Sequence, residues 1–252
     1  MLRSSLPGAD RLALRTGAVV IANCEAINLL RKAGVPESQL FPVAGGERLP
    51  IFTRAVLEQA ASGSCDILPG PPGAPARPHP RLASFSIHVW PSLHCLMPGS
   101  HGDMPAVFDT GKVYTGSATQ YDCTVDITHS MTWGLMCLDE IVPPEAVDEK
   151  MRAMADFMKD RETNIMSGCD GGQLMYNVVF EDKAVLFNTH LGGYEGIMRL
   201  LEPSPDVVVM GIPGRANHNG RPFDGSAAQF AVKQVEWLRH PRKVIWSLHD
   251  ER

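Results

Sequence analysis

The sequence predicts an α/β fold with a mixed β-sheet. The main observation is that apolar strand patterns and helical patterns alternate in the last third of the chain. Such alternation is typical of layered α/β proteins. A strand pattern at 17–22 followed by a helical pattern repeats this order near the start. Hydrophobic residues make up 44% of the 252 residues and charged residues 20%, which is typical of a globular chain.

The first strand and helix are predicted from the run 17–22 and from Asn23, which can cap a helix that begins after it. Ile27 and Leu30 are expected to face the core, and Gly34 to end the helix. The next segment, 40–52, has two apolar runs around Gly45 and Gly46. That pattern predicts a β-hairpin.

Residues 61–81 are rich in proline and glycine, which exclude a helix interior and a central strand. We expect an exposed loop there, within a single domain over residues 1–252. A strand is predicted at 83–90 and a helix at 140–160. The composition of residues 95–130 favours neither element.

The last third begins with strands at 173–180 and 184–187, joined by a tight turn. A short helix at 194–201 and a buried strand at 206–212 follow. Ser226 can cap the next helix, and a last strand is expected at 244–247. The residues expected on the buried face of the helix that Ser226 caps are Ala228, Ala231, Val235 and Leu238.

Charge and apolar patterns limit the classes of function. The formal net charge is −5, whereas a protein that binds nucleic-acid phosphates normally has a basic excess. No apolar run reaches the ~18–20 residues that cross a bilayer, and the first residues lack the apolar core of a signal peptide. We therefore expect a cytoplasmic protein that contacts neither nucleic acid nor membrane. Its six cysteines form no C-x-x-C pair and are expected to be reduced thiols.

Three polar segments lie just past the ends of predicted strands. They are His94, the run Asn188-Thr189-His190, and the pair His249-Asp250. Polar residues at strand ends are held rigidly and can converge on one edge of a sheet, where imidazoles are able to bind zinc. Each histidine could equally be a hydrogen-bonded or surface residue, and both interpretations stay open.

Other polar residues are weaker candidates, because we expect most of them in solvent-exposed loops. They are His79, His101, Asp103, His129, Asp170 and His218. The run 192–196 follows a strand and opens a helix, which suggests a phosphate site, but it lacks the G-x-G-x-x-G spacing of a dinucleotide fold. The sequence also lacks a G-x-S-x-G nucleophile elbow and a Walker-type loop.

The order of five segments resembles the metallo-β-lactamase fold in its broad hydrolase branch. The segments are Ala9–Asn23, Gly45-Gly46-Glu47, Pro91-Ser92-Leu93-His94, the stretch from Gly171 to Thr189, and Val244–Asp250. They span most of the chain apart from the proline-rich loop. The resemblance implies an αββα sandwich that acts as a metal-dependent hydrolase, with one or two divalent ions, normally zinc, and a small-molecule substrate.

The resemblance also assigns roles to particular residues. It implies that His94 and His249 are metal ligands and that Asn188 stands where the family has a bridging aspartate. His190 would substitute for that aspartate as a ligand, and Asp250 would be a catalytic partner beside the metal. In the family, metal-activated water attacks an ester, amide or phosphoester.

The sequence departs from the family because it contains no H-x-H-x-D-H motif, which supplies most of the family's ligands. We therefore expect an N-terminally incomplete αββα sandwich with weak metal binding and impaired hydrolysis. The alternative is a non-catalytic or truncated relative that acts, if at all, as a binding domain. A third hypothesis is a small-molecule binding domain that uses residues 192–196. The oligomeric state is left open.

Overall fold

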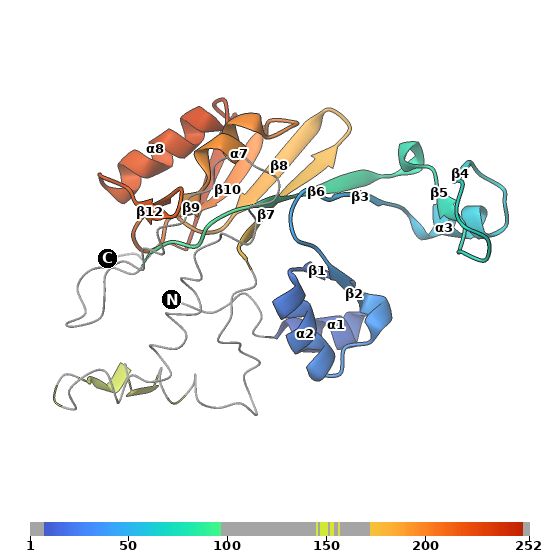
Figure 1. Ribbon diagram of the computed structural model, residues 1–252, viewed down its shortest axis with the longest axis horizontal. Coiled ribbons are helices and arrows are strands. Elements are labelled where there is room, and N and C mark those ends of the chain that lie inside the picture. Colours follow the sequence, from blue (N-terminus) through green and yellow to red (C-terminus); the bar gives the residue numbers. More distant parts are fainter. Residues whose placement is uncertain are drawn as a thin grey trace.

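The structure is a computed structural model that describes residues 8–96 and 172–248, with 145, 147–150, 152–153 and 156 between them (Figure 1). Its centre is a six-stranded mixed sheet in the order β13-β10-β8-β7-β6-β3. The strands are β3 (Arg48–Ile51), β6 (Phe85–Pro91), β7 (Leu174–Phe180), β8 (Lys183–Asn188), β10 (Val207–Gly211) and β13 (Lys243–Ser247). The predicted α/β class with a mixed sheet is confirmed.

The sheet has an antiparallel half and a parallel half. Strands β3, β6, β7 and β8 pair antiparallel to their neighbours, whereas β8, β10 and β13 are parallel. The predicted turn between β7 and β8 is present, and Glu181 in it adopts a left-handed φ of 50°. Because β6 and β8 both run antiparallel to β7, their carboxyl ends emerge at the same edge of the sheet.

Helices α7 (Glu195–Leu200) and α8 (Ala227–Trp237) lie together on one side of this sheet (Figure 1). Side chains of the sheet and of both helices share one hydrophobic core. Its fully buried members include Leu186 and Val208 of the sheet, Met198 of α7 and Phe230 of α8. This core makes the sheet a rigid support for the loops at its edges.

Helix α8 begins at the predicted cap. The Ser226 hydroxyl accepts from the Gln229 backbone N–H at 3.2 Å, and the Gln229 side chain accepts from the Ser226 N–H at 2.7 Å. Its expected buried face is wrong in part, because Ala228 is exposed and Val235 only half-buried. The large side chains Phe230 and Trp237 set the buried face instead, together with Ala231, Gln234 and Leu238.

A small N-terminal unit has its own hydrophobic cluster. It contains α1 (Ala9–Thr16), β1 (Val20–Ala22), α2 (Cys24–Lys32), the 3₁₀ turn η1 (Glu37–Gln39) and β2 (Leu40–Pro42). The predicted cap is confirmed, since the Asn23 side chain accepts from the Ala26 N–H at 2.9 Å. The Tyr176 hydroxyl donates to the Ile21 carbonyl at 3.3 Å, which ties β1 to the central sheet.

The predicted hairpin over 40–52 is wrong. Strand β2 pairs in parallel with β1, whereas β3 pairs with β6 in the central sheet. Gly45 lies between the two strands with φ 108° and packs closely on Pro91. A Cβ added at Gly45 would lie 2.8 Å from the side chain of Pro91. The glycine pair therefore carries the chain from one sheet to another instead of turning it back.

The proline-rich stretch is mostly exposed, as predicted from its composition. It follows α3 (Arg54–Ala61) and holds a two-stranded ladder of β4 (Ile67–Leu68) and β5 (Arg77–Pro78). The 3₁₀ turn η2 (Pro80–Leu82) then leads into β6.

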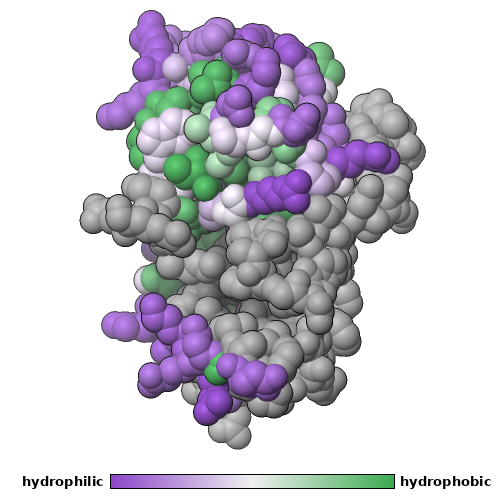
Figure 2. Space-filling model, turned by 90° about the vertical axis from the view of Figure 1, so that its left-hand side faces the viewer, coloured by the Kyte–Doolittle hydropathy of each residue, from purple (hydrophilic) through white to green (hydrophobic). Residues whose placement is uncertain are grey.

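A second small sheet lies beside the edge where β6 and β8 end. It contains β9 (Gly192–Gly193), β11 (Asn217–His218) and β12 (Arg221–Pro222). Figure 2 views the molecule from the left of Figure 1, where α8 lies, and its upper part shows apolar side chains interrupted by polar ones.

Within the described part of the chain, no helix combines the length and apolar character needed to cross a membrane. The helix expected at 140–160 lies outside the described residues, apart from isolated positions.

Candidate metal centre

Two of the predicted histidines meet at the edge shared by β6 and β8. His94 follows β6, and His190 follows β8. Their ring centroids lie 3.9 Å apart with an interplanar angle of 34°. The expectation that strand ends bring these imidazoles together is therefore confirmed for this pair.

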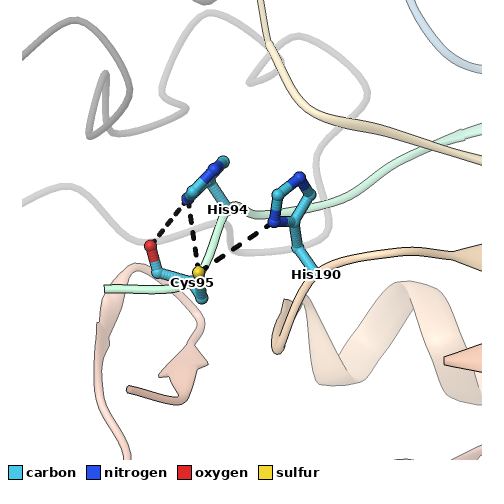
Figure 3. Close-up of side chains that lie close together, drawn as sticks. All are labelled: His94, Cys95 and His190. Atoms are coloured by element: carbon cyan, nitrogen blue, oxygen red, sulfur yellow. Dashed lines mark hydrogen bonds between the residues drawn. The ribbon is translucent and has the colours of Figure 1, made fainter. Parts of the chain in front are cut away.

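Cys95 joins the two histidines (Figure 3). Its Sγ lies 3.6 Å from His94 Nδ1 and 4.0 Å from His190 Nδ1. One potential ligand atom from each of the three residues lies within 4.8 Å of the others, and all three side chains are buried. This spacing allows the group to hold a metal ion.

A hydrogen bond to the backbone determines which ring nitrogen of His94 keeps a lone pair for a metal ion. His94 Nδ1 lies 2.8 Å from the backbone carbonyl oxygen of Cys95. Because a carbonyl can only accept, Nδ1 carries the proton and Nε2 keeps its lone pair. Histidines that bind metals commonly donate their other N–H in this way, which fixes the ring orientation.

Burial controls the protonation of the group. It lowers the pKa of His94, although the bond to the Cys95 carbonyl opposes the shift, and lowers the pKa of His190 to about 3 with help from the nearby His94. Both imidazoles are therefore neutral at pH 7, as metal binding requires. Burial raises the pKa of the Cys95 thiol to about 11, so the metal-free group carries no charge at neutral pH.

Asn188 lies at the same edge, but its side chain is engaged by the protein. Its Oδ1 accepts from the Ser92 hydroxyl at 2.8 Å, and its Nδ2 donates to the Gly192 carbonyl at 3.1 Å. The side chain is fully buried. Both polar ends of the amide thus have protein partners, and its role as a metal ligand remains a prediction.

The remaining predicted site residues, His249 and Asp250, lie outside the described residues. The same holds for four weaker candidates, which are His101, Asp103, His129 and Asp170. His218 lies elsewhere, with Nε2 3.1 Å from a Glu195 carboxylate oxygen and its ring stacked on Trp237. The His79 side chain accepts from the Arg81 N–H and caps η2.

The backbone around the group is fixed from both sides. Leu96 and Arg215 exchange two backbone hydrogen bonds, of 2.7 and 2.9 Å, directly after Cys95. The buried Asn217 donates from Nδ2 to the His94 carbonyl at 2.8 Å. On the other side, Gly211 packs so closely on the Thr189 carbonyl that an added Cβ would lie 2.0 Å from it. The two histidine-bearing turns therefore have little freedom to move.

Sequence reasoning missed Cys95. Its only signal is adjacency to His94, since a single cysteine in a buried segment is normally a small apolar residue. The glycines in the run 192–196, which suggested a phosphate site, also have a structural role. Those at 192 and 193 form β9, and an added Cβ at Gly192 would lie 2.4 Å from the Leu93 carbonyl oxygen.

Comparisons of the chain with protein-family models, with curated proteins and with solved structures found no match. The chemistry of the site therefore rests on its residues alone. Two neutral imidazoles and one sulfur are a donor set that fits zinc and other borderline or soft divalent ions better than magnesium or calcium, which prefer oxygen.

Proposed function

We propose that this chain is a metal-dependent hydrolase of the metallo-β-lactamase type, with zinc held by His94, Cys95 and His190. The observation that carries the proposal is the buried group of three ligand types at the edge shared by β6 and β8. The order of the five sequence segments and the mixed sheet support the same family. The proposed substrate is a small molecule with a hydrolysable acyl or phosphoryl bond.

The three residues have complementary tasks in this proposal. His94 would offer an imidazole nitrogen, and the Cys95 carbonyl lies 2.8 Å from its Nδ1 and orients the ring. His190 offers an imidazole that stays neutral well below pH 7 because burial lowers its pKa to about 3. Cys95 would supply the negative charge, since a thiol that coordinates a cation loses its proton. Bound zinc supplies Lewis acidity and activates water as a nucleophile.

Within residues 8–96 and 172–248, the group offers three potential ligands, a number that is compatible with catalysis. Catalytic zinc sites typically have three protein ligands and keep one position for water or substrate. A set of two histidines and one cysteine is among the ligand sets found in such sites. Structural zinc sites more often have four protein ligands.

A structural or binding role is the second candidate, because the group is closed off from solvent. The exposed fractions of His94, Cys95 and His190 are only 7%, 5% and 7%. A third possibility, nucleophilic catalysis by Cys95 without metal, is disfavoured. A nucleophilic cysteine needs a lowered pKa, whereas burial raises the pKa of Cys95 to about 11.

The test is hydrolysis of a panel of lactones, β-lactams, thioesters and phosphodiesters by the purified chain, with bound metal measured in the same samples. We expect slow hydrolysis of at least one class, because the H-x-H-x-D-H motif is missing, and we expect a chelator to abolish it and added zinc to restore it. His190→Ala should abolish it, and the matched control His218→Ala should not. Tightly bound zinc without any hydrolysis would support the structural role instead.

A further inference from the structure

One hydrogen bond joins the two turns that carry the histidines. The Ser92 hydroxyl donates to Asn188 Oδ1 at 2.8 Å. Ser92 precedes His94 by two residues, and Asn188 precedes His190 by two residues. The bond therefore spans the same two segments that the proposed zinc ion would bridge.

We propose that Ser92 and Asn188 are positioning residues, which set the separation of His94 and His190 without contacting the metal. The inference rests on the proposed function for its consequence in zinc affinity. The spacing that Ser92 and Asn188 set between the two imidazole rings is the same claim for the metal-free protein.

Burial gives this hydrogen bond its importance. Ser92 and Asn188 each have an exposed fraction of 0%. In an environment without water, a hydrogen bond that loses one partner leaves the other unsatisfied, which is energetically costly. The two turns are therefore held in the arrangement in which the hydroxyl and the amide meet.

Each partner is itself held from a second direction. The backbone N–H of Ser92 donates to the Gln173 carbonyl at 2.8 Å, next to β7. Asn188 Nδ2 donates to the Gly192 carbonyl at 3.1 Å, and Gln234 of α8 donates to the same carbonyl at 3.2 Å. Neither side chain can thus turn toward another partner without breaking a buried bond.

An amide at position 188 suits this task better than a carboxylate. Asn188 must both accept from Ser92 and donate to Gly192. An ionised aspartate can only accept, so it would face the Gly192 carbonyl with a second oxygen. A metal-bridging residue would show the opposite preference, because a carboxylate is a stronger ligand for a dication than an amide.

The experiment compares zinc affinity in the full chain for the parent and for Ser92→Ala, Asn188→Asp and Asn177→Ala, with folding checked by circular dichroism. Asn177 is the matched control, because it is equally buried but donates to the Pro203 carbonyl at 2.8 Å. We expect Ser92→Ala and Asn188→Asp to weaken zinc binding by about 10–100-fold, as loss of ligand-orienting partners typically does. Asn177→Ala should leave the affinity unchanged. Tighter zinc binding by Asn188→Asp would overturn the inference in favour of a ligand role.

A second measurement needs no metal. Imidazole ¹H–¹⁵N spectra are recorded after a chelator has removed any metal. Relative to the parent, the His94 and His190 signals should be shifted in Ser92→Ala but not in Asn177→Ala. Unshifted signals in Ser92→Ala would overturn the positioning role whatever the zinc result. If the parent chain binds no zinc while Ser92→Ala still shows these shifts, the proposed function is refuted and the positioning role stands.

Discussion

His94 and His190 face each other with ring centroids 3.9 Å apart, although they follow two different strands, β6 and β8. The relationship follows from the sheet, because β6 and β8 both lie beside β7 and run in the same direction. Cys95 fills the third position of the group, with Sγ within 4.0 Å of His190 Nδ1.

The first prediction concerns the reactivity of Cys95 in the protein from which a chelator has removed any metal. Because burial raises the pKa of its thiol to about 11, iodoacetamide at pH 7.5 should alkylate Cys95 more than about tenfold more slowly than the exposed Cys24. Peptide mass spectrometry of timed samples measures both rates. In urea the two should react alike. Preferential labelling of Cys95 in the folded protein would instead identify a nucleophile and contradict the metal-ligand assignment.

The second prediction concerns stability against pH without metal. Burial lowers the folded-state pKa of His190 to about 3, whereas the unfolded chain should titrate near 6.5. Below pH 6.5 the unfolded state therefore binds a proton that the folded state does not, and the free energy of unfolding falls as pH falls toward 3. Between pH 6.5 and 5.5 this group should remove about 1 kcal/mol.

Urea unfolding at both pH values measures the loss, and His190→Gln is the comparison because glutamine does not titrate. The parent should lose about 1 kcal/mol more than the variant over this interval. An equal loss in both proteins would show that His190 titrates normally in the folded state.

The third prediction tests the close approach of the two turns. An added Cβ at Gly192 would lie 2.4 Å from the Leu93 carbonyl oxygen, so Gly192→Ala should destabilise the fold by about 3 kcal/mol and weaken zinc binding. Gly196 in α7 is the control, because an added Cβ there meets no atom within 4 Å. Gly196→Ala should be neutral or stabilise by up to about 1 kcal/mol, as measured by urea unfolding. Equal effects of both substitutions would contradict the close contact between Gly192 and the Leu93 carbonyl.

Local patterns predicted much of the fold. The apolar runs and turn of the β7–β8 hairpin and the caps Asn23 and Ser226 all depend on residues close in sequence. The hairpin expected over 40–52 failed because its two strands pair with distant partners, β1 and β6. Such pairing depends on tertiary packing that a local pattern does not contain.

The site was predictable to a similar degree. The rule that polar residues follow strands identified His94 and His190, because strand direction alone brings them to one edge. Cys95 was missed, since its proximity to His190 depends on the turn that the Leu96–Arg215 backbone pair fixes. The hydrogen bonds of Asn188 depend equally on a distant residue, Ser92, which no sequence spacing indicates.

The fourth prediction tests the proposed metal centre most directly. The measurement is a titration with Co²⁺ of the full chain after a chelator has removed any bound metal. Co²⁺ should bind at one equivalent per chain and give a thiolate-to-cobalt absorption band, because Cys95 would be a ligand. Cys95→Ser should lose the band, His190→Ala should weaken binding by more than about 100-fold, and Cys24→Ser should change neither. Absence of the band in the parent, or a band that survives Cys95→Ser but disappears in Cys24→Ser, would contradict a metal centre at His94, Cys95 and His190.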